Sequence, residues 1–275
     1  MTYVIAEIGI NHNGDMDLAK ELIVTAGSCG CDAVKFQKRD IESVYTQEEL
    51  DTPRESPFGT TTREQKEGIE FSIEEYKELQ TYTHELGLDF IVSCWDEKSL
   101  DLVEEHLDVK YHKVASAMVT DKSFLEKLND TGKPIILSTG MCTDEQVDAA
   151  LKILKNTEYL LACTSTYPTK EEEINLKYIT TLKEKYPHLS VGFSNHYSGL
   201  AACIGATALS AECLEFHITK DRTMYGSDQI ASIESVRELM VSVKKIQKML
   251  GDGKKVVYDS EKPIIDKLRK IENTI

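Results

Sequence analysis

Two histidines stand where strands of a predicted sheet should end: His196 in GFSNHYSG and His217 in CLEFHITKDR. If both strands belong to a parallel barrel, both side chains project from the rim formed by the carboxyl ends of the strands, where that fold keeps its chemistry. Two neutral imidazoles on neighbouring strand ends can hold a divalent metal and leave coordination positions open for water and substrate. The pair therefore predicts a catalytic metal site.

Further polar residues occupy the same kind of position. Burying an ionisable group inside a barrel costs several kcal/mol unless the group is paired or used for function. In chain order, these strand-end residues are Glu7, Lys35, Gln37, Lys113, Ser116, Ser138, residues 164–167 (which include Ser165 and Tyr167), and Glu215. Two lysines, two glutamates and two histidines on one rim predict an active site that binds an anion as well as a metal.

Some of these residues also have a purely structural interpretation. A strand lysine such as Lys110 or Lys113 can lie outside the barrel with its charge in solvent. Alternation in KYHKVAS separates Lys113 from the apolar Val114, which favours an inward Lys113. His12 in NHNG fits a turn and a substrate contact equally well. The seven cysteines lack metal-ligand spacing, and those in apolar strand patterns are expected to be reduced core residues: Cys94, Cys163 and Cys213.

The elements that must position these residues alternate regularly along the chain. Strands are predicted at residues 3–8, 33–37, 89–94, 111–116, 134–139, 159–164, 189–194 and 213–218. Helices are predicted at residues 16–28, 73–86, 97–106, 123–130, 144–155, 176–186, 199–208 and 233–250. Alternating βα units imply parallel strands with right-handed crossovers, which favours a closed (β/α)8 TIM barrel as a single α/β domain.

We expect this barrel to span residues 1–251 and a helical tail to span residues 252–275, with no second domain. Residues 40–70 are polar, contain proline and are too long for an ordinary βα loop. They form either a surface excursion with a short helix or a lid over the barrel mouth. The lid is favoured because this loop leaves the catalytic face.

Composition excludes several classes of function. The chain has 275 residues and a net charge of −15, which argues against nucleic-acid binding because phosphate contacts need a basic face. Its apolar runs are strand-sized, so no membrane association is expected. The amino-terminal segment lacks a basic region before its apolar residues and is interrupted by Glu7. It does not fit a secretory signal, and a cytoplasmic protein is expected.

The motifs, taken together, resemble a known family. AEIGINHNGD, VKFQ, YHKVAS, LSTGM, CTSTYPT, GFSNHYSG and EFHITKDRTMYGSDQ are similar to the successive strand-end signatures of sialic acid (N-acetylneuraminate) synthases, in the right order over nearly the whole chain. The resemblance implies a metal-dependent transferase that condenses phosphoenolpyruvate with the aldehyde of a free or phosphorylated N-acetylmannosamine-like hexose. The products would be a nonulosonic acid and phosphate. Mn²⁺ is the expected metal, with Mg²⁺ or Co²⁺ as alternatives.

The resemblance also assigns roles to residues. His196 and His217 match the metal ligands. The residues that match the phosphoenolpyruvate site are Lys35, Lys113, Ser116, Ser138 and Tyr167, and those around the sugar and the metal-bound water are Glu7, Gln37, Glu215 and Asp228. Glu7, Lys35, Lys113 and Glu215 are the expected catalytic groups, with Glu7 or Glu215 taking a proton from the attacking water. The others, including Ser165, are expected to bind substrate.

The chain departs from the family pattern in the donor pocket (Ser165 and Cys94), beside a metal ligand (Asn195) and beside the sugar (Gln229). The family's C-terminal antifreeze-like domain, which delivers an arginine to the N-acyl group across a domain-swapped dimer, has no counterpart in this sequence. Either residues 40–70 or a separate partner protein is expected to supply the side of the acceptor site that this domain forms in the family, or the acceptor lacks the N-acyl group. A homodimer is still expected.

Two alternatives stay open. One is another phosphoenolpyruvate-dependent 3-deoxy-ulosonate synthase with a sugar phosphate as acceptor. Such barrels commonly place a cysteine after the first strand, where this chain has Glu7 and Asn11. The other is a non-catalytic sugar-binding barrel.

Overall fold

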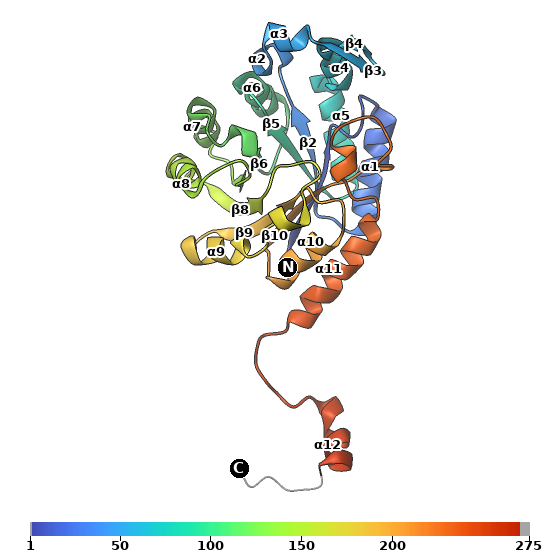
Figure 1. The fold of residues 1–275 in the computed structure, drawn as a ribbon, viewed down its shortest axis with the longest axis vertical. Helices are drawn as coiled ribbons and strands as arrows, with labels where there is room; N and C mark the ends of the chain where they lie inside the picture. The colour runs from blue at the N-terminus through green and yellow to red at the C-terminus, as the bar shows by residue number, and fades with distance from the viewer. Residues whose placement is uncertain (1, 270–275) are drawn as a thin grey trace.

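The computed structural model describes residues 2–269 and contains a closed barrel of eight parallel strands (Figure 1). Around the barrel the strands follow the order β1-β10-β9-β8-β7-β6-β5-β2. They are β1 (Tyr3–Gly9), β2 (Ala33–Lys38), β5 (Asp89–Cys94), β6 (His112–Val114), β7 (Ile135–Ser138), β8 (Thr157–Cys163), β9 (Ser190–Asn195) and β10 (Cys213–His217). Each strand lies within one or two residues of its predicted position, and the (β/α)8 fold is confirmed.

Eight helices surround the strands: α1 (Met16–Cys29), α5 (Ile73–Glu85), α6 (Glu97–His106), α7 (Lys122–Asp130), α8 (Asp144–Ile153), α9 (Tyr178–Lys185), α10 (Ala201–Ala208) and α11 (Val236–Leu250). Short 3-10 turns are η1 (Ser116–Met118), η2 (Glu171–Glu173), η3 (Gln229–Ala231) and η4 (Asp259–Glu261). Helix α1 shows how individual residues determine where a helix begins and ends. The Asp15 carboxylate accepts from the first free backbone N–H groups, and Gly30 ends the helix at φ 85°.

The register of the strands brings the polar strand ends together. Glu7 of β1 is paired with His217 on one side and with Lys35 on the other. Glu215 is paired in the same way with Ser194 of β9. Paired residues of a parallel ladder point to the same face of the sheet, so these side chains converge inside the barrel mouth.

Apolar side chains close the opposite end of the barrel. The interior below the polar residues is filled by a cluster that includes Ile5, Ile91 and Leu161. The rings of Tyr3, Tyr111 and Tyr159 then lie against one another with centroids 5.5 to 5.9 Å apart. A larger apolar cluster packs the outer faces of the strands against the helices. Access to the interior is therefore from the carboxyl ends of the strands.

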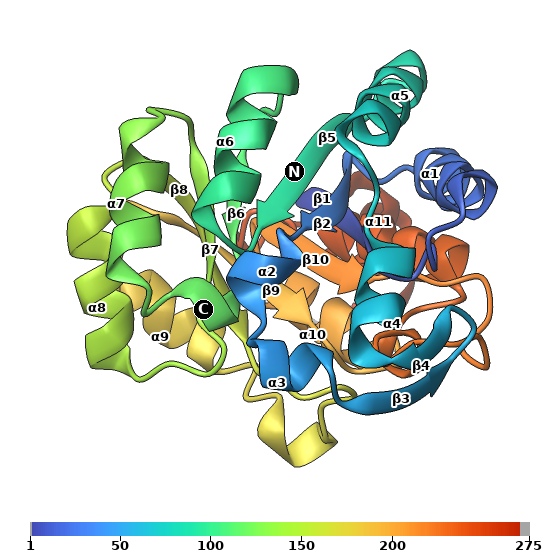
Figure 2. The same cartoon turned by 90° about the horizontal axis from the view of Figure 1, so that it is seen from above.

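Residues 40–70 form an ordered excursion with more structure than the predicted short helix. Its elements are α2 (Ile41–Val44), α3 (Gln47–Leu50), β3 (Pro53–Ser56), β4 (Gly59–Thr61) and α4 (Thr62–Ile69). Arg54 Nε lies 3.4 Å from Tyr225 Oη, and Phe58 meets the same ring edge-on, so the β3–β4 hairpin rests on the loop after β10 (Figure 2). Gly14 meets Gly68 so closely that a Cβ there would lie 2.0 Å from the Gly68 carbonyl oxygen. The excursion is thus anchored at the rim of the barrel.

After α11 the chain leads away from the barrel to α12 (Lys262–Leu268), at the end of the molecule opposite the excursion (Figure 1). Of the expected helical tail at residues 252–275, η4 and α12 cover residues 259–268, residues 252–258 are not helical, and residues 270–275 lie outside the described residues. Within residues 2–269, no helix combines the length and the apolar character needed to cross a membrane.

Candidate active site at the carboxyl end of the barrel

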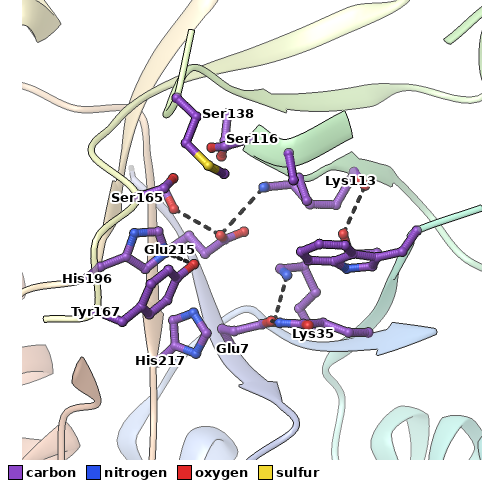
Figure 3. A pocket seen from close by; sticks show the side chains of 17 residues that line it. Glu7, Lys35, Lys113, Ser116, Ser138, Ser165, Tyr167, His196, Glu215 and His217 are labelled. Atoms are coloured by element: carbon purple, nitrogen blue, oxygen red, sulfur yellow. Dashed lines mark hydrogen bonds and ion pairs between the residues drawn. The ribbon is translucent and has the colours of Figure 1, made fainter. Parts of the chain in front are cut away.

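A polar pocket lies at the carboxyl ends of the strands, and every barrel strand or the loop that follows it contributes to the lining. All the predicted site residues except Asp228 line this pocket. Figure 3 shows His196, His217 and Tyr167 gathered on one side, Ser116, Ser138 and Ser165 on another, and Glu215 between them and Lys113. The pocket thus brings together the groups that sequence spacing predicted.

Two buried ion pairs form the floor of the pocket. Lys35 Nζ lies 2.7 Å from Glu7 Oε2, and Lys113 Nζ lies 3.6 Å from Glu215 Oε1, with each side chain at most 5% exposed. Burial alone would raise the pKa of Glu215, but Lys113, Lys35 and His217 lower it to about 2. Burial also lowers the pKa of Lys113. Because charge is balanced only between partners, removing one member leaves a buried unpaired charge.

Replacing Glu215 with Gln tests this balance. We expect the variant to lose on the order of 3 kcal/mol of unfolding free energy at pH 7, because Lys113 loses its paired carboxylate while Lys35 keeps Glu7. Since the pKa of Glu215 is lower in the folded protein than its ordinary 4.5, this stabilisation is complete above about pH 4.5 and declines as the pH falls toward 2. Urea unfolding of both proteins from pH 7 to pH 3 should show the difference shrinking below pH 4.5. A difference that is constant with pH would contradict the assignment.

Three serine hydroxyls line one wall of the pocket around Gly140. A Cβ on Gly140 would lie 2.1 Å from Ser165 Oγ and 2.7 Å from Ser116 Oγ, so only glycine leaves this space open. Ser138 Oγ is buried and has no hydrogen-bond partner among residues 2–269. Hydroxyl donors around a small space next to Lys113 suit the oxygens of a phosphate or carboxylate.

Gly140→Ala should close this serine cradle while leaving the fold intact, because Gly140 is not among the residues with positive φ. We expect binding of phosphoenolpyruvate to weaken at least about tenfold, because the methyl group fills the space in which the ligand's oxygens would accept hydrogen bonds from the hydroxyls. Isothermal titration with phosphoenolpyruvate measures this change. Gly27→Ala is the matched control. Gly27 lies in helix α1, far from the pocket lining, and a Cβ there would make only an ordinary contact with Leu88, at 3.4 Å. Equal affinity in the two variants would place the anion elsewhere.

The two histidines have their nitrogens arranged for different partners. His196 Nδ1 lies 2.9 Å from the Thr164 carbonyl oxygen, which only an N–H can satisfy, and its Nε2 lies 2.9 Å from Tyr167 Oη; in the neutral ring this Nε2 carries the lone pair. His217 Nδ1 is buried without a hydrogen-bond partner in the described chain and lies 3.7 Å from Asp228 Oδ2. The ring centroids are 5.3 Å apart.

This pair fits a divalent cation in an open site. Burial lowers the pKa of His217, which favours the neutral form that a metal ligand needs. No group of three or more His, Cys, Asp or Glu within residues 2–269 is placed to hold a metal, so water and substrate would have to complete the coordination. The unpartnered Nδ1 of His217 and, in place of its contact with Tyr167, the Nε2 of a neutral His196 would supply two ligands.

One of the three cysteines expected in the core does not lie there. Cys163 is not a core residue: its Sγ lies 3.5 Å from Ser165 Oγ and 3.7 Å from His196 Nδ1. Burial would raise the pKa of Cys163, but His196 lowers it to about 7. Cys94 packs in the outer apolar cluster as predicted, and its neighbours Ser93 and Trp95 line the pocket. The physical reason for the error at Cys163 is the alternation of the strand, whose phase the apolar pattern alone did not fix.

The contacts of three further residues, Gln229, Asn195 and His12, show what each side chain does in the structure. Gln229 is fully buried and bonds Thr219 and the Asn11 carbonyl, so it supports the loop after β10 and does not line the pocket. Asn195 bonds the backbone of Tyr197 through its amide. His12 stacks on Phe71 with centroids 4.1 Å apart and accepts from Gly14 N, which gives it the structural role of the two considered.

The lining residues that sequence reasoning missed include Ser93, Trp95 and Ser194. Ser194 Oγ donates to Glu215 Oε1 at 3.0 Å. It stands two residues before His196, and the period of a strand could have predicted that both side chains face inward. Trp95 is the one tryptophan of the chain and follows a strand end directly, a signal that was available from the sequence.

Comparisons with known proteins agree with this geometry. Residues 22–255 match the model of the NeuB family. An N-acetylneuraminate-9-phosphate synthase of Mus musculus is 39% identical, over 98% of this chain and 76% of the relative. An N,N'-diacetyllegionaminic acid synthase of Legionella pneumophila is 35% identical, over 95% of this chain and 77% of the relative. The crystal structure of N-acetylneuraminic acid synthetase from Leptospira borgpetersenii, in complex with citrate, superposes with a TM-score of 0.83 and 31% identity. It covers 98% of this chain and 93% of that one. The chain belongs to the NeuB family.

Proposed function

We propose that this protein is a carbon–carbon bond-forming transferase that condenses phosphoenolpyruvate with an N-acetylmannosamine-like or related hexose, giving a nonulosonic acid and phosphate. Its relatives are named synthases of sialic and legionaminic acids. The observation that carries the proposal is one pocket that holds an anion cradle, two buried lysine–glutamate pairs and an imidazole pair (Figure 3).

The donor would occupy the side of the pocket formed by the serines and lysines. Ser116, Ser138 and Ser165 offer hydroxyls around Gly140 for the phosphate oxygens. Lys113 and Lys35 add positive charge in a buried setting, where a charge-assisted hydrogen bond is stronger than in water. Phosphoenolpyruvate carries both a phosphate and a carboxylate, so this end of the pocket suits it.

The acceptor would occupy the opposite side, with its aldehyde near His196 and His217. Tyr167 Oη lies next to His196, and Asp228 lies next to His217, so both can contact sugar hydroxyls. A divalent cation held by the two histidines, with Mn²⁺ preferred to Mg²⁺ or Co²⁺, would supply Lewis acidity at the aldehyde oxygen. Gln37 and Glu7 complete this edge of the pocket.

The chain's own groups account for the proton and charge changes. The methylene carbon of phosphoenolpyruvate bonds to the aldehyde carbon, the aldehyde oxygen gains a proton, and positive charge develops at the enol carbon. Glu215 and Glu7 are the two buried carboxylates that can stabilise this charge and take a proton from the water that adds there. The bond from that carbon to the phosphate oxygen then breaks as the added hydroxyl gives up its proton and becomes the ketone oxygen, so that the two protons of the water end on the former aldehyde oxygen and on the phosphate. Phosphate leaves toward the serines and lysines, and a ketone remains.

Phosphate release from phosphoenolpyruvate tests the proposal. The protein is stripped of metal, supplied again with Mn²⁺, and assayed with free and 6-phosphorylated N-acetylmannosamine, mannose and arabinose 5-phosphate. We expect release that needs both Mn²⁺ and a hexose acceptor. Release with arabinose 5-phosphate alone would favour a 3-deoxy-ulosonate synthase, and binding without release by any acceptor would favour a non-catalytic barrel.

A further inference from the structure

Arg39 lies directly behind the acceptor edge of the pocket. It follows β2, and its Nη2 donates to Oε1 of Gln37, a lining residue. Its guanidinium carbon stands 4.1 Å from the ring centroid of Trp95, another lining residue. The arginine side chain is 10% exposed, so this contact is made out of bulk solvent. Stacking on an aromatic face holds a planar guanidinium in one orientation.

Gln37 is thereby held between two partners of opposite character. Its Nε2 donates to Glu7 Oε1 at 2.6 Å, while its Oε1 accepts from Arg39. A guanidinium can only donate, and an ionised carboxylate can only accept. A flipped amide would set N–H against N–H and oxygen against oxygen. The two neighbours therefore define a single orientation of the amide, an orientation that is otherwise ambiguous for glutamine.

We propose that Arg39 is a positioning residue that locks the Gln37 amide, so that an N–H of Gln37, and not its carbonyl, faces the acceptor. This inference rests on the proposed function. The carbonyl oxygen is directed to Arg39 and one amide hydrogen to Glu7, which leaves the second hydrogen as the group that Gln37 can present. The acceptor must therefore offer an oxygen lone pair at this point, from a hydroxyl, a carbonyl or a phosphate ester.

The surroundings support the lock from two further sides. Glu70, which follows α4 at the end of the excursion, accepts from the Arg39 backbone N–H at 3.3 Å and lies 3.9 Å from Nη1. Gly9 leaves room for the amide, because a Cβ there would lie 2.9 Å from Glu7 Oε1 and 3.0 Å from Gln37 Nε2. The orientation of Gln37 thus depends on the packing of the excursion against the barrel.

A double-mutant cycle tests whether Arg39 acts through Gln37. Arg39→Met, Gln37→Met and the double variant are compared with the unmodified protein for the KM of acceptor and of phosphoenolpyruvate. We expect Arg39→Met to raise the acceptor KM about tenfold or more, with the phosphoenolpyruvate KM unchanged, and the double variant to be no worse than Gln37→Met. Arg39→Lys, which keeps a donor, should recover part of the loss. Arg63→Met, at a partly exposed arginine of the excursion that does not line the pocket, is the control and should change neither KM.

Additive effects in the cycle, or an equal rise in the phosphoenolpyruvate KM, would overturn the positioning role. The same cycle is measured in urea unfolding, where the Arg39–Gln37 contact should give a non-additive term independent of turnover. If the unmodified protein turned over no acceptor, the proposed function would fail. The unfolding cycle would then decide the Arg39–Gln37 lock by itself: additivity would overturn it, and coupling would support it.

Discussion

Lys113→Met is expected to lower kcat/KM for phosphoenolpyruvate by about a thousandfold or more. Lys113 is buried, lies 3.6 Å from Glu215 Oε1, and lines the pocket beside the serine cradle. A substrate that carries both a phosphate and a carboxylate loses one charge-assisted donor in a buried site and also faces an unpaired Glu215 carboxylate, so attraction is replaced by repulsion. Each tenfold loss corresponds to about 1.4 kcal/mol of transition-state stabilisation, and a buried charged contact can supply several such factors.

The measurement is steady-state phosphate release with the acceptor held at saturation. Lys110→Met is the matched control, because Lys110 pairs with Asp89 at the surface and lies two residues before β6, the strand that holds Lys113. It should retain activity within about twofold, since exposed ion pairs contribute little. Circular dichroism separates lost chemistry from lost fold, and Lys113→Arg, which keeps the charge, provides a second variant. A folded Lys113→Met protein with an unchanged kcat/KM would remove Lys113 from the donor site.

His217→Ala is expected to abolish Mn²⁺-dependent phosphate release, a loss of at least about a thousandfold. The variant removes one of the two imidazoles that fit a cation, and its Nδ1 has no hydrogen-bond partner within residues 2–269. Since a metal held by two protein ligands cannot spare one of them, the affinity for Mn²⁺ should fall together with the activity. Metal content after equilibrium dialysis provides a readout that does not depend on turnover.

His106→Ala is the control for this prediction, because His106 lies at the end of α6 and is partly exposed. It should bind as much Mn²⁺ as the unmodified protein. His217→Gln adds a neutral side chain of similar reach and tests whether the imidazole itself is required. If either His217 variant kept both the metal and the activity, the metal would have to sit elsewhere in the pocket.

Much of the fold could be predicted because its rules are local. Apolar strands and amphipathic helices alternate along the chain, and a residue at the end of an inward-facing strand position must lie at the mouth of the barrel. For this reason Lys113 could be placed inside from the alternation of KYHKVAS, and it does line the pocket. The register that puts Glu7 between Lys35 and His217 follows from the same parallel order.

The predictions failed where the sequence pattern did not show which side chains of a strand point into the barrel. Cys163 lies in an apolar strand, and nothing in that pattern distinguishes the inner from the outer face. Gln229 begins η3, a single 3-10 turn in the loop after β10 that is too short to show a periodic pattern, and its burial depends on contacts with residues more than two hundred positions away, such as Asn11.

The sequence of the excursion, residues 40–70, contains helix-start signals that a search for periodic apolar residues does not detect. Thr46 with Glu49 and Thr61 with Glu64 form capping boxes that start α3 and α4, and the Thr-x-x-Glu spacing is readable in the sequence. What could not be read is where the folded excursion rests. Its contact with the loop after β10, through Tyr225, joins segments far apart in the chain.

The most direct test of the central claim is the fate of the bridging oxygen of phosphoenolpyruvate. The donor is prepared with a heavy oxygen isotope between the enol carbon and phosphorus, and is incubated with the protein, Mn²⁺ and the best acceptor. Cleavage between carbon and oxygen predicts that the label leaves entirely in the phosphate, alongside a keto acid with three carbons more than the acceptor. Label retained in pyruvate or in the sugar product, with unlabelled phosphate, would mean cleavage between phosphorus and oxygen and would contradict the condensation.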